Sequence, residues 1–263
     1  MPLPALSSVS LSLNLRVAHI ARRVGTALPH FAHTLLPNLC ALCGNLSQQV
    51  ICADCDAAYW NEARLRCRVC AVPLGRFRHA ATAGYRCGDC VAEPPSFDAT
   101  FALADYRPPL DALATGLKFG ARLMLAREFA SRLARVADHA LEATALPDLV
   151  VPVPLARLRL VQRGYNQAWE IAKPFARALQ LRADPTLLVR TLDTAPQSRL
   201  DRAARHRNVG TAFVVTKPVS GLHVAVVDDV MTSGATLDAL ARVLKAAGAQ
   251  RVTSLVALRT PQD

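Results

Sequence analysis

Three signatures that mark large classes of protein are missing from this sequence. No apolar run reaches the ~20 residues that a membrane-spanning helix needs, so we expect no transmembrane segment. No G-K-S/T triplet occurs, which excludes a phosphate-binding loop of the Walker type. No cysteine follows Cys90, so any chemistry that depends on thiols is confined to the chain before that point.

Acidic residues are also missing from the start of the chain, where Asp54 is the first carboxylate. A basic leader without acids is typical of targeting peptides, but no cationic residue precedes the first apolar stretch, which argues against a secretory signal. Apolar residues recur at helical spacing within residues 15–36. We therefore expect residues 1–36 to form an amphipathic helical segment that packs on the body of the protein. Contact with a membrane surface is the alternative.

What the chain does contain is an excess of positive charge and enough apolar surface for a core. A formal charge of +11 accompanies a hydrophobic content of 52% over 263 residues. This content excludes disorder by composition, and the length suits one α/β domain with a small additional module. The arginine-rich balance fits either solvated helix faces or a polyanionic partner, such as nucleic acid or a phosphorylated small molecule.

The cysteines form four C-x-x-C pairs. They are Cys40 and Cys43, Cys52 and Cys55, Cys67 and Cys70, and Cys87 and Cys90. Two such pairs complete a tetrahedral site with four sulfur ligands and no open coordination position. We predict two structural zinc ions rather than disulfides or an iron–sulfur cluster, because the chain lacks a convincing secretory signal and redox pairs usually occur singly. Sequential sharing of the pairs between the ions is the simplest arrangement, and a crossed one is the alternative.

Strand and helix patterns alternate after a linker at Pro94 and Pro95. Strands are expected at 97–107, 148–154, 185–191, 222–229 and 251–260, and helices at 108–145 (with a break near 116–120), 166–181 and 236–249. This alternation predicts an α/β fold with a parallel sheet covered on both faces. Together with the cysteine pairs, it divides the chain into a helical segment at 1–36, a double zinc ribbon at 37–93 and a sheet domain at 97–263.

The stretch VAVVDDVMTSGAT places two acids, Asp228 and Asp229, at the end of an apolar strand. Ligands of parallel sheets bind at this end of the strands. The following loop leads into a helix whose free N–H groups suit a phosphate, and it consists of Thr232, Ser233, Gly234, Ala235 and Thr236. The acids suit sugar hydroxyls or a Mg²⁺-linked group. A ligand that joins a phosphate to vicinal hydroxyls is a ribose 5-phosphate.

This stretch resembles the 5-phosphoribosyl-1-pyrophosphate (PRPP) motif of type I phosphoribosyltransferases. The likeness extends over residues 37–263, through RGYNQA from Arg163, the stretch at 194–213 and the cysteine pairs. These residues look like the ComF family, whose members are competence-associated, phosphoribosyltransferase-like proteins with an amino-terminal zinc ribbon. The resemblance implies a type I phosphoribosyltransferase-like sheet domain behind the cysteine-rich module. No departure from the family pattern occurs in the phosphate loop.

The resemblance also implies a role for each motif. The loop 232–236 would bind the 5-phosphate, and Asp228 and Asp229 would be the catalytic acids that face the ribose hydroxyls. The turn at 155–159 would lie near the pyrophosphate, with Arg163 just beyond it. Residues 194–208 correspond to a hood that holds Arg199, Arg202, Arg205 and Arg207, and a solvated loop is the alternative interpretation. Lys118 matches the family pattern without an evident role.

The function that the resemblance implies is PRPP binding in DNA uptake or the use of external DNA. A Mg²⁺-dependent phosphoribosyl transfer would displace pyrophosphate at C1 of the ribose. No general base for a nucleobase stands out, so the acceptor stays open. The alternative is a non-catalytic PRPP sensor or a partner protein that binds single-stranded DNA. A DNA-uptake helicase or other competence proteins are the implied partners, in the cytoplasm or at the inner face of the membrane.

Overall fold

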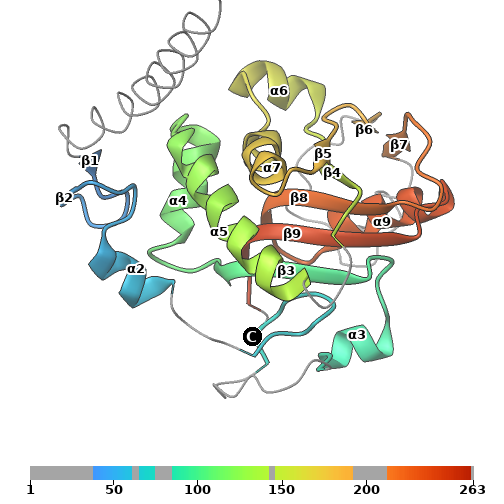
Figure 1. The fold of residues 1–263 in the computed structure, drawn as a ribbon, viewed down its shortest axis with the longest axis horizontal. Coiled ribbons are helices and arrows are strands. Elements are labelled where there is room, and N and C mark those ends of the chain that lie inside the picture. Colours follow the sequence, from blue (N-terminus) through green and yellow to red (C-terminus); the bar gives the residue numbers. More distant parts are fainter. Residues whose placement is uncertain (1–37, 61–64, 75–84, 142–145, 192–211, 262–263) are drawn as a thin grey trace, which may run out of the picture. The chain divides into compact units, whose positions relative to one another are not determined.

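The computed structural model describes residues 38–60, 65–74, 85–141, 146–191 and 212–261 (Figure 1). The expected helix in residues 1–36 and the arginine-rich stretch 194–208 lie outside the described residues. The contacts divide the chain into two compact units, Met1–Cys55 and Asp56–Asp263. Among the described residues, no helix combines the length and the apolar character needed to cross a membrane.

The first unit contains a small antiparallel pair of strands around the first cysteines. Strand β1 (Asn38–Leu39) pairs with β2 (Leu46–Ser47). Between them the chain reverses at Gly44, whose φ of 76° lies in the left-handed region that glycine adopts without strain. The Gly44 N–H donates to the Cys40 carbonyl at 2.9 Å, which closes the turn that carries the first C-x-x-C pair.

A parallel sheet of five strands in the order β3-β9-β8-β4-β5 forms the centre of the second unit. The strands are β3 (Ala99–Asp105), β4 (Leu149–Pro152), β5 (Arg182–Ala183), β8 (His223–Met231) and β9 (Arg251–Arg259). The helices of this unit are α3 (Gly88–Ala92), α4 (Asp111–Phe119), α5 (Met124–Leu141), α6 (Arg157–Arg163), α7 (Gln167–Ala178) and α9 (Ala235–Ala246), and α2 (Ala53–Tyr59) spans the boundary between the units. The α/β class and the parallel sheet predicted from the sequence are confirmed.

Alternate residues of the central strands bury against different layers, because successive side chains point to opposite faces of a sheet. Val224 and Val226 belong to the same core cluster as Leu240 and Leu244 of α9. The intervening Ala225 and Val227 are fully buried but do not belong to that cluster. Helix α7 also contacts β8 and β4, and it packs against α5. Both faces of the sheet are therefore covered by helices, as expected (Figure 1).

The stretch at 185–191 does form a strand, but it does not join the parallel sheet. Its strand β6 (Leu188–Arg190) pairs antiparallel with β7 (Phe213–Val215) in a separate small sheet. Strand β7 was not expected, because a three-residue strand carries too few positions to show an alternating pattern. The edge strand beside β4 is instead the two-residue β5.

Candidate functional site

The eight thiols form two groups of four, each within one part of the sequence. Their sulfur atoms lie within 4.8 Å of one another in each group; the first comprises Cys40, Cys43, Cys52 and Cys55, and the second Cys67, Cys70, Cys87 and Cys90. The sharing is thus sequential rather than crossed. All eight cysteines are free thiols.

The donor geometry of both groups fits a tetrahedral metal ion. The Sγ atoms of Cys43 and Cys52 lie 3.7 Å apart, and those of Cys70 and Cys87 lie 3.6 Å apart. A disulfide needs ~2.05 Å, whereas ligands ~2.3 Å from zinc in a tetrahedron lie about 3.8 Å from one another. All-sulfur coordination leaves no position for water or substrate, so these sites are structural.

Backbone N–H groups favour the thiolate form of one ligand in each group. The N–H of Cys52 donates to Sγ of Cys40, and that of Cys87 donates to Sγ of Cys67, both at 3.3 Å. Burial opposes ionisation, but the backbone donors outweigh it and lower the pKa of Cys40 to about 6 and that of Cys67 to about 7. Because thiolates are the ligands of zinc, this arrangement favours metal binding by Cys40 and Cys67.

Asp228 and Asp229 lie within β8 rather than after its end, because the strand continues to Met231. As neighbours in a strand they point to opposite faces. Asp229 is 2% exposed, and its Oδ2 lies 2.9 Å from Nζ of Lys118 on α4. Lys118 thereby acquires the role that the sequence did not reveal, which is to neutralise the buried acid.

Asp228 is the more accessible acid of the pair. It is partly exposed, and one of its carboxylate oxygens accepts the N–H of Asp229 at 2.9 Å. Burial, followed by repulsion from the Asp229 carboxylate, raises the pKa of Asp228 well above its ordinary value, and the charge of Lys118 only partly opposes this. A ligand that donates hydrogen bonds or carries a cation would favour the ionised form.

The loop after β8 ends in a helix N-terminus whose N-cap residue is a glycine. Gly234 is the N-cap of α9 with φ of 84° and without a side-chain hydrogen bond. The first N–H of the helix, that of Ala235, donates a long hydrogen bond of 3.4 Å to the Ser233 hydroxyl. Unsatisfied N–H groups and the helix dipole together suit an anion.

We expect Gly234→Ala to weaken phosphate binding by about tenfold, which corresponds to ~1.4 kcal/mol of strain. A Cβ at this position would lie 2.6 Å from Cε of Met231, and its left-handed φ disfavours every residue with a side chain. Calorimetric titration with PRPP measures the effect. Gly221→Ala is the matched control, because Gly221 has φ of 74° but open space around its Cβ and lies at the other end of β8. Equal losses in both variants would contradict a role for the loop.

Arg259 fixes this loop from the neighbouring strand. It is 1% exposed at the end of β9, and its guanidinium donates to the carbonyls of Met231, Thr232 and Thr260. Its Nε donates to the carbonyl of Cys70 at 2.8 Å. One side chain therefore joins the turn of the second cysteine group to the start of the loop 232–236. The signal in the sequence that could have identified Arg259 was a charged residue at the end of an otherwise apolar strand.

A basic cavity of about 500 Å³ lies beside the acids. Lys118, Arg159, Gln162, Arg163 and Tyr165 contribute to its wall. Lys118 also contacts Asp229, so the cavity adjoins the acidic end of β8. Arg159 and Arg163 thus line a cavity whose wall includes the partner of Asp229, whereas Arg205 lies outside the described residues.

Two family models match the chain. Residues 31–91 match the double zinc ribbon domain, and residues 166–263 match the phosphoribosyl transferase domain. The first range contains both sulfur groups, and the second contains the acids and the loop. The expected combination of a cysteine-rich zinc module and a phosphoribosyltransferase-like sheet domain is therefore confirmed. The boundaries at 36/37 and 93/97 stay predictions.

Named relatives align with much of the chain. This chain is 35% identical over 230 residues to the DNA utilization protein YhgH of Escherichia coli O6:H1, and the alignment covers 86% of this chain and 98% of that protein. It is 31% identical over 172 residues to Competence protein F of Haemophilus influenzae, with 63% and 75% covered. Among solved structures, a purine phosphoribosyltransferase from Pyrococcus horikoshii aligns with 50% of this chain and 82% of its own at 16% identity and a TM-score of 0.31.

Proposed function

Because the chain belongs to the ComF family, we propose that it binds PRPP and acts through this ligand in the use of external DNA. The observation that carries the proposal lies at the carboxyl-terminal end of β8, where a helix N-terminus with a glycine N-cap follows a partly exposed carboxylate. Beside them lies a cavity with three cationic side chains. PRPP combines a phosphate, vicinal hydroxyls and a pyrophosphate, and each group has a complementary feature there.

In the proposed complex the 5-phosphate accepts hydrogen bonds from the first N–H groups of α9 and from the hydroxyls of the loop 232–236. The ribose hydroxyls donate to Asp228, which is the accessible acid. Asp229 positions Lys118 through their ion pair. Lys118, Arg159 and Arg163 face the pyrophosphate from the basic cavity.

The proposed reaction is displacement at C1 of the ribose. The bond from C1 to the pyrophosphate oxygen breaks, the acceptor forms a new bond to C1 and loses its proton, and pyrophosphate leaves as the anion. The cationic side chains stabilise the charge that develops on the leaving group. The Asp228 carboxylate fits a hard cation with oxygen ligands, and Mg²⁺ bound there with PRPP would supply further charge neutralisation.

We expect PRPP to bind saturably to zinc-loaded protein in the presence of Mg²⁺, with an affinity that rises with pH. The free protein holds a proton on Asp228 at a pH above the ordinary carboxyl range, because its pKa is raised. Ribose hydroxyls bind best to the ionised form, so binding releases this proton, and the affinity stops rising once the free carboxyl has ionised. Calorimetry in two buffers of different ionisation enthalpy measures the protons released.

The Asp228→Asn variant is the control for this titration, because PRPP itself loses protons over part of the same range. Proton release that persists unchanged in the variant would assign it to the ligand and contradict the role of Asp228. Absence of binding to folded, zinc-loaded wild-type protein would overturn the proposed function. Release of pyrophosphate with a candidate acceptor then distinguishes an enzyme from a PRPP sensor.

A further inference from the structure

A second basic cavity, of about 640 Å³, lies at the amino-terminal ends of the strands, whereas the acids lie near the carboxyl-terminal end of β8. Part of its wall comes from the start of β8 at His223 and the start of β9 at Arg251, and Asp98 lies immediately before β3. Parallel strands begin at one end of the sheet and finish at the other, and neither the two acids nor the loop 232–236 lines this cavity. Its volume lies within the ~300–1,000 Å³ of small-molecule sites.

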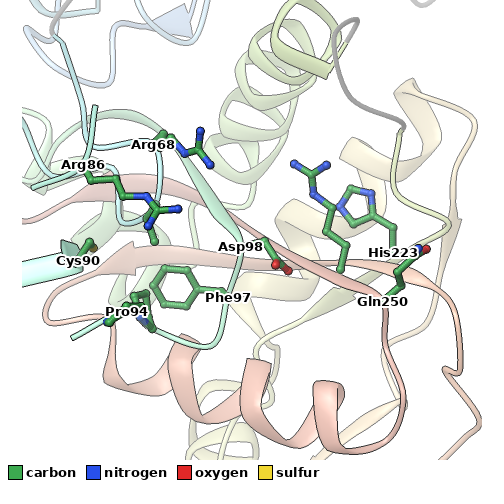
Figure 2. Close-up of a pocket in the computed structure, with 11 residues that line it drawn as sticks. Arg68, Arg86, Cys90, Pro94, Phe97, Asp98, His223 and Gln250 are labelled. Atoms are coloured by element: carbon green, nitrogen blue, oxygen red, sulfur yellow. The ribbon is translucent and has the colours of Figure 1, made fainter. Parts of the chain in front are cut away.

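The other wall of this cavity comes from the second zinc module. Arg68 follows the ligand Cys67, and Arg86 precedes the ligand Cys87. Figure 2 shows both arginine side chains on the zinc-module side, across from His223 and Gln250 on the sheet side. Two regions distant in the sequence thus enclose one space, and both contribute cationic groups.

Three guanidinium groups in this cavity have no acidic partner among the described residues: those of Arg68, Arg86 and Arg251. Arg68 and Arg86 are exposed. Nε of Arg251 is buried and has no hydrogen-bond partner among the described residues. A buried donor without a partner is destabilising.

The acid in the cavity wall does not balance this charge, because it is already engaged. Oδ2 of Asp98 lies 2.8 Å from Nζ of Lys245 and accepts the N–H of Val252 at 2.7 Å. The charge of Asp98 is thus offset by Lys245. The cavity therefore presents an excess of positive charge from planar groups, which bind phosphate oxygens in pairs.

We propose that this cavity binds a phosphate ester, carried either by a strand of nucleic acid or by a free nucleotide. The site goes beyond the proposed PRPP site and uses none of its residues. Arg68 and Arg86 hold the phosphate from the zinc module, and Arg251 holds it from the sheet. The zinc module thereby serves as one wall of a binding site as well as a structural element.

The test compares full-length, zinc-loaded protein with an Arg68→Gln/Arg86→Gln variant. Binding of a fluorescein-labelled oligothymidylate is followed by anisotropy over a range of salt concentrations, and binding of AMP is followed by calorimetry. Arg127→Gln/Arg135→Gln is the matched control, because it removes the same charge from two exposed positions on α5. We expect the pocket variant to lose about tenfold in affinity for the phosphate ligand and about one unit of salt slope for each lost contact.

The two ligands separate the two sources of the phosphate. Loss of oligothymidylate binding alone in the pocket variant assigns the site to a nucleic acid backbone, and loss of AMP binding assigns it to a free nucleotide. Equal affinities in the pocket and control variants would overturn the proposal. Loss of zinc from the pocket variant would also overturn it, because the arginines would then serve to balance the charge of the thiolates.

Failure of this proposal is distinguishable from failure of the proposed function. The pocket variant is expected to bind PRPP as the wild type does, and Asp228→Asn is expected to bind oligothymidylate as the wild type does. Competition between PRPP and the oligonucleotide, together with weaker oligonucleotide binding in Asp228→Asn, would place both ligands beside Asp228 at the carboxyl-terminal end of β8. That result would refute a second site.

Discussion

Replacement of Asp228 by Asn is expected to weaken PRPP binding by about tenfold to a hundredfold, because hydrogen bonds to a charged acceptor contribute ~1.5–3 kcal/mol. The folded state should not lose stability. Burial and repulsion from the Asp229 carboxylate raise the pKa of Asp228, so its ionised form is disfavoured in the fold. A neutral amide of similar shape removes that repulsion. Calorimetric titration measures the affinity, and thermal unfolding measures the stability.

Two matched variants locate the effect. Asp138→Asn removes the same charge from an exposed position on α5 and should leave the affinity unchanged. Asp229→Asn should lower the stability as well as the affinity, because it removes the partner of Lys118 at a buried position. If Asp229→Asn alone weakened PRPP binding while Asp228→Asn did not, the roles assigned to the two acids would have to be exchanged.

Loss of the second zinc site through Cys67→Ser is expected to destabilise the sheet domain, not only the zinc module. Cys67, Cys70 and Cys90 belong to the same core cluster as Val226 and Leu240. Loss of a structural metal is among the largest single-site effects, on the order of 4 kcal/mol. For a unit of this size that corresponds to a melting temperature lower by roughly 8–16 °C. Thermal unfolding followed by circular dichroism, with zinc content measured in parallel, checks the result.

The same variant should also weaken PRPP binding, since Arg259 connects the carbonyl of Cys70 to that of Thr232 in the phosphate loop. Cys40→Ser is the matched control, because it removes a ligand from the sulfur group of the other compact unit. It should release zinc without the same loss of PRPP affinity. Equal melting temperatures for Cys67→Ser and the wild type, with zinc absent from the second site, would contradict a shared core.

The sequence by itself determined the local motifs of both parts of the protein. The C-x-x-C spacing places two sulfur ligands on one turn, so zinc sites follow from local geometry alone. The apolar run before Asp228 and the glycine loop after it likewise predict a strand, a turn and a helix within one short stretch. The cap of α7 is equally local, because the Asn166 side chain accepts the N–H of Ala168 two residues later.

Only the tertiary structure decided how these local features act on one another. The ion pair of Lys118 with Asp229 joins positions more than a hundred residues apart, and the bond from Arg259 to Cys70 spans 189 positions. The cavity lined by Arg68, Arg86 and Arg251 likewise forms only because the second zinc module lies beside the amino-terminal ends of the strands. Periodicity and spacing record the contacts of neighbours in the chain, whereas these contacts depend on how helices and strands pack. The residue types were therefore legible in the sequence, but their partners were fixed by the fold.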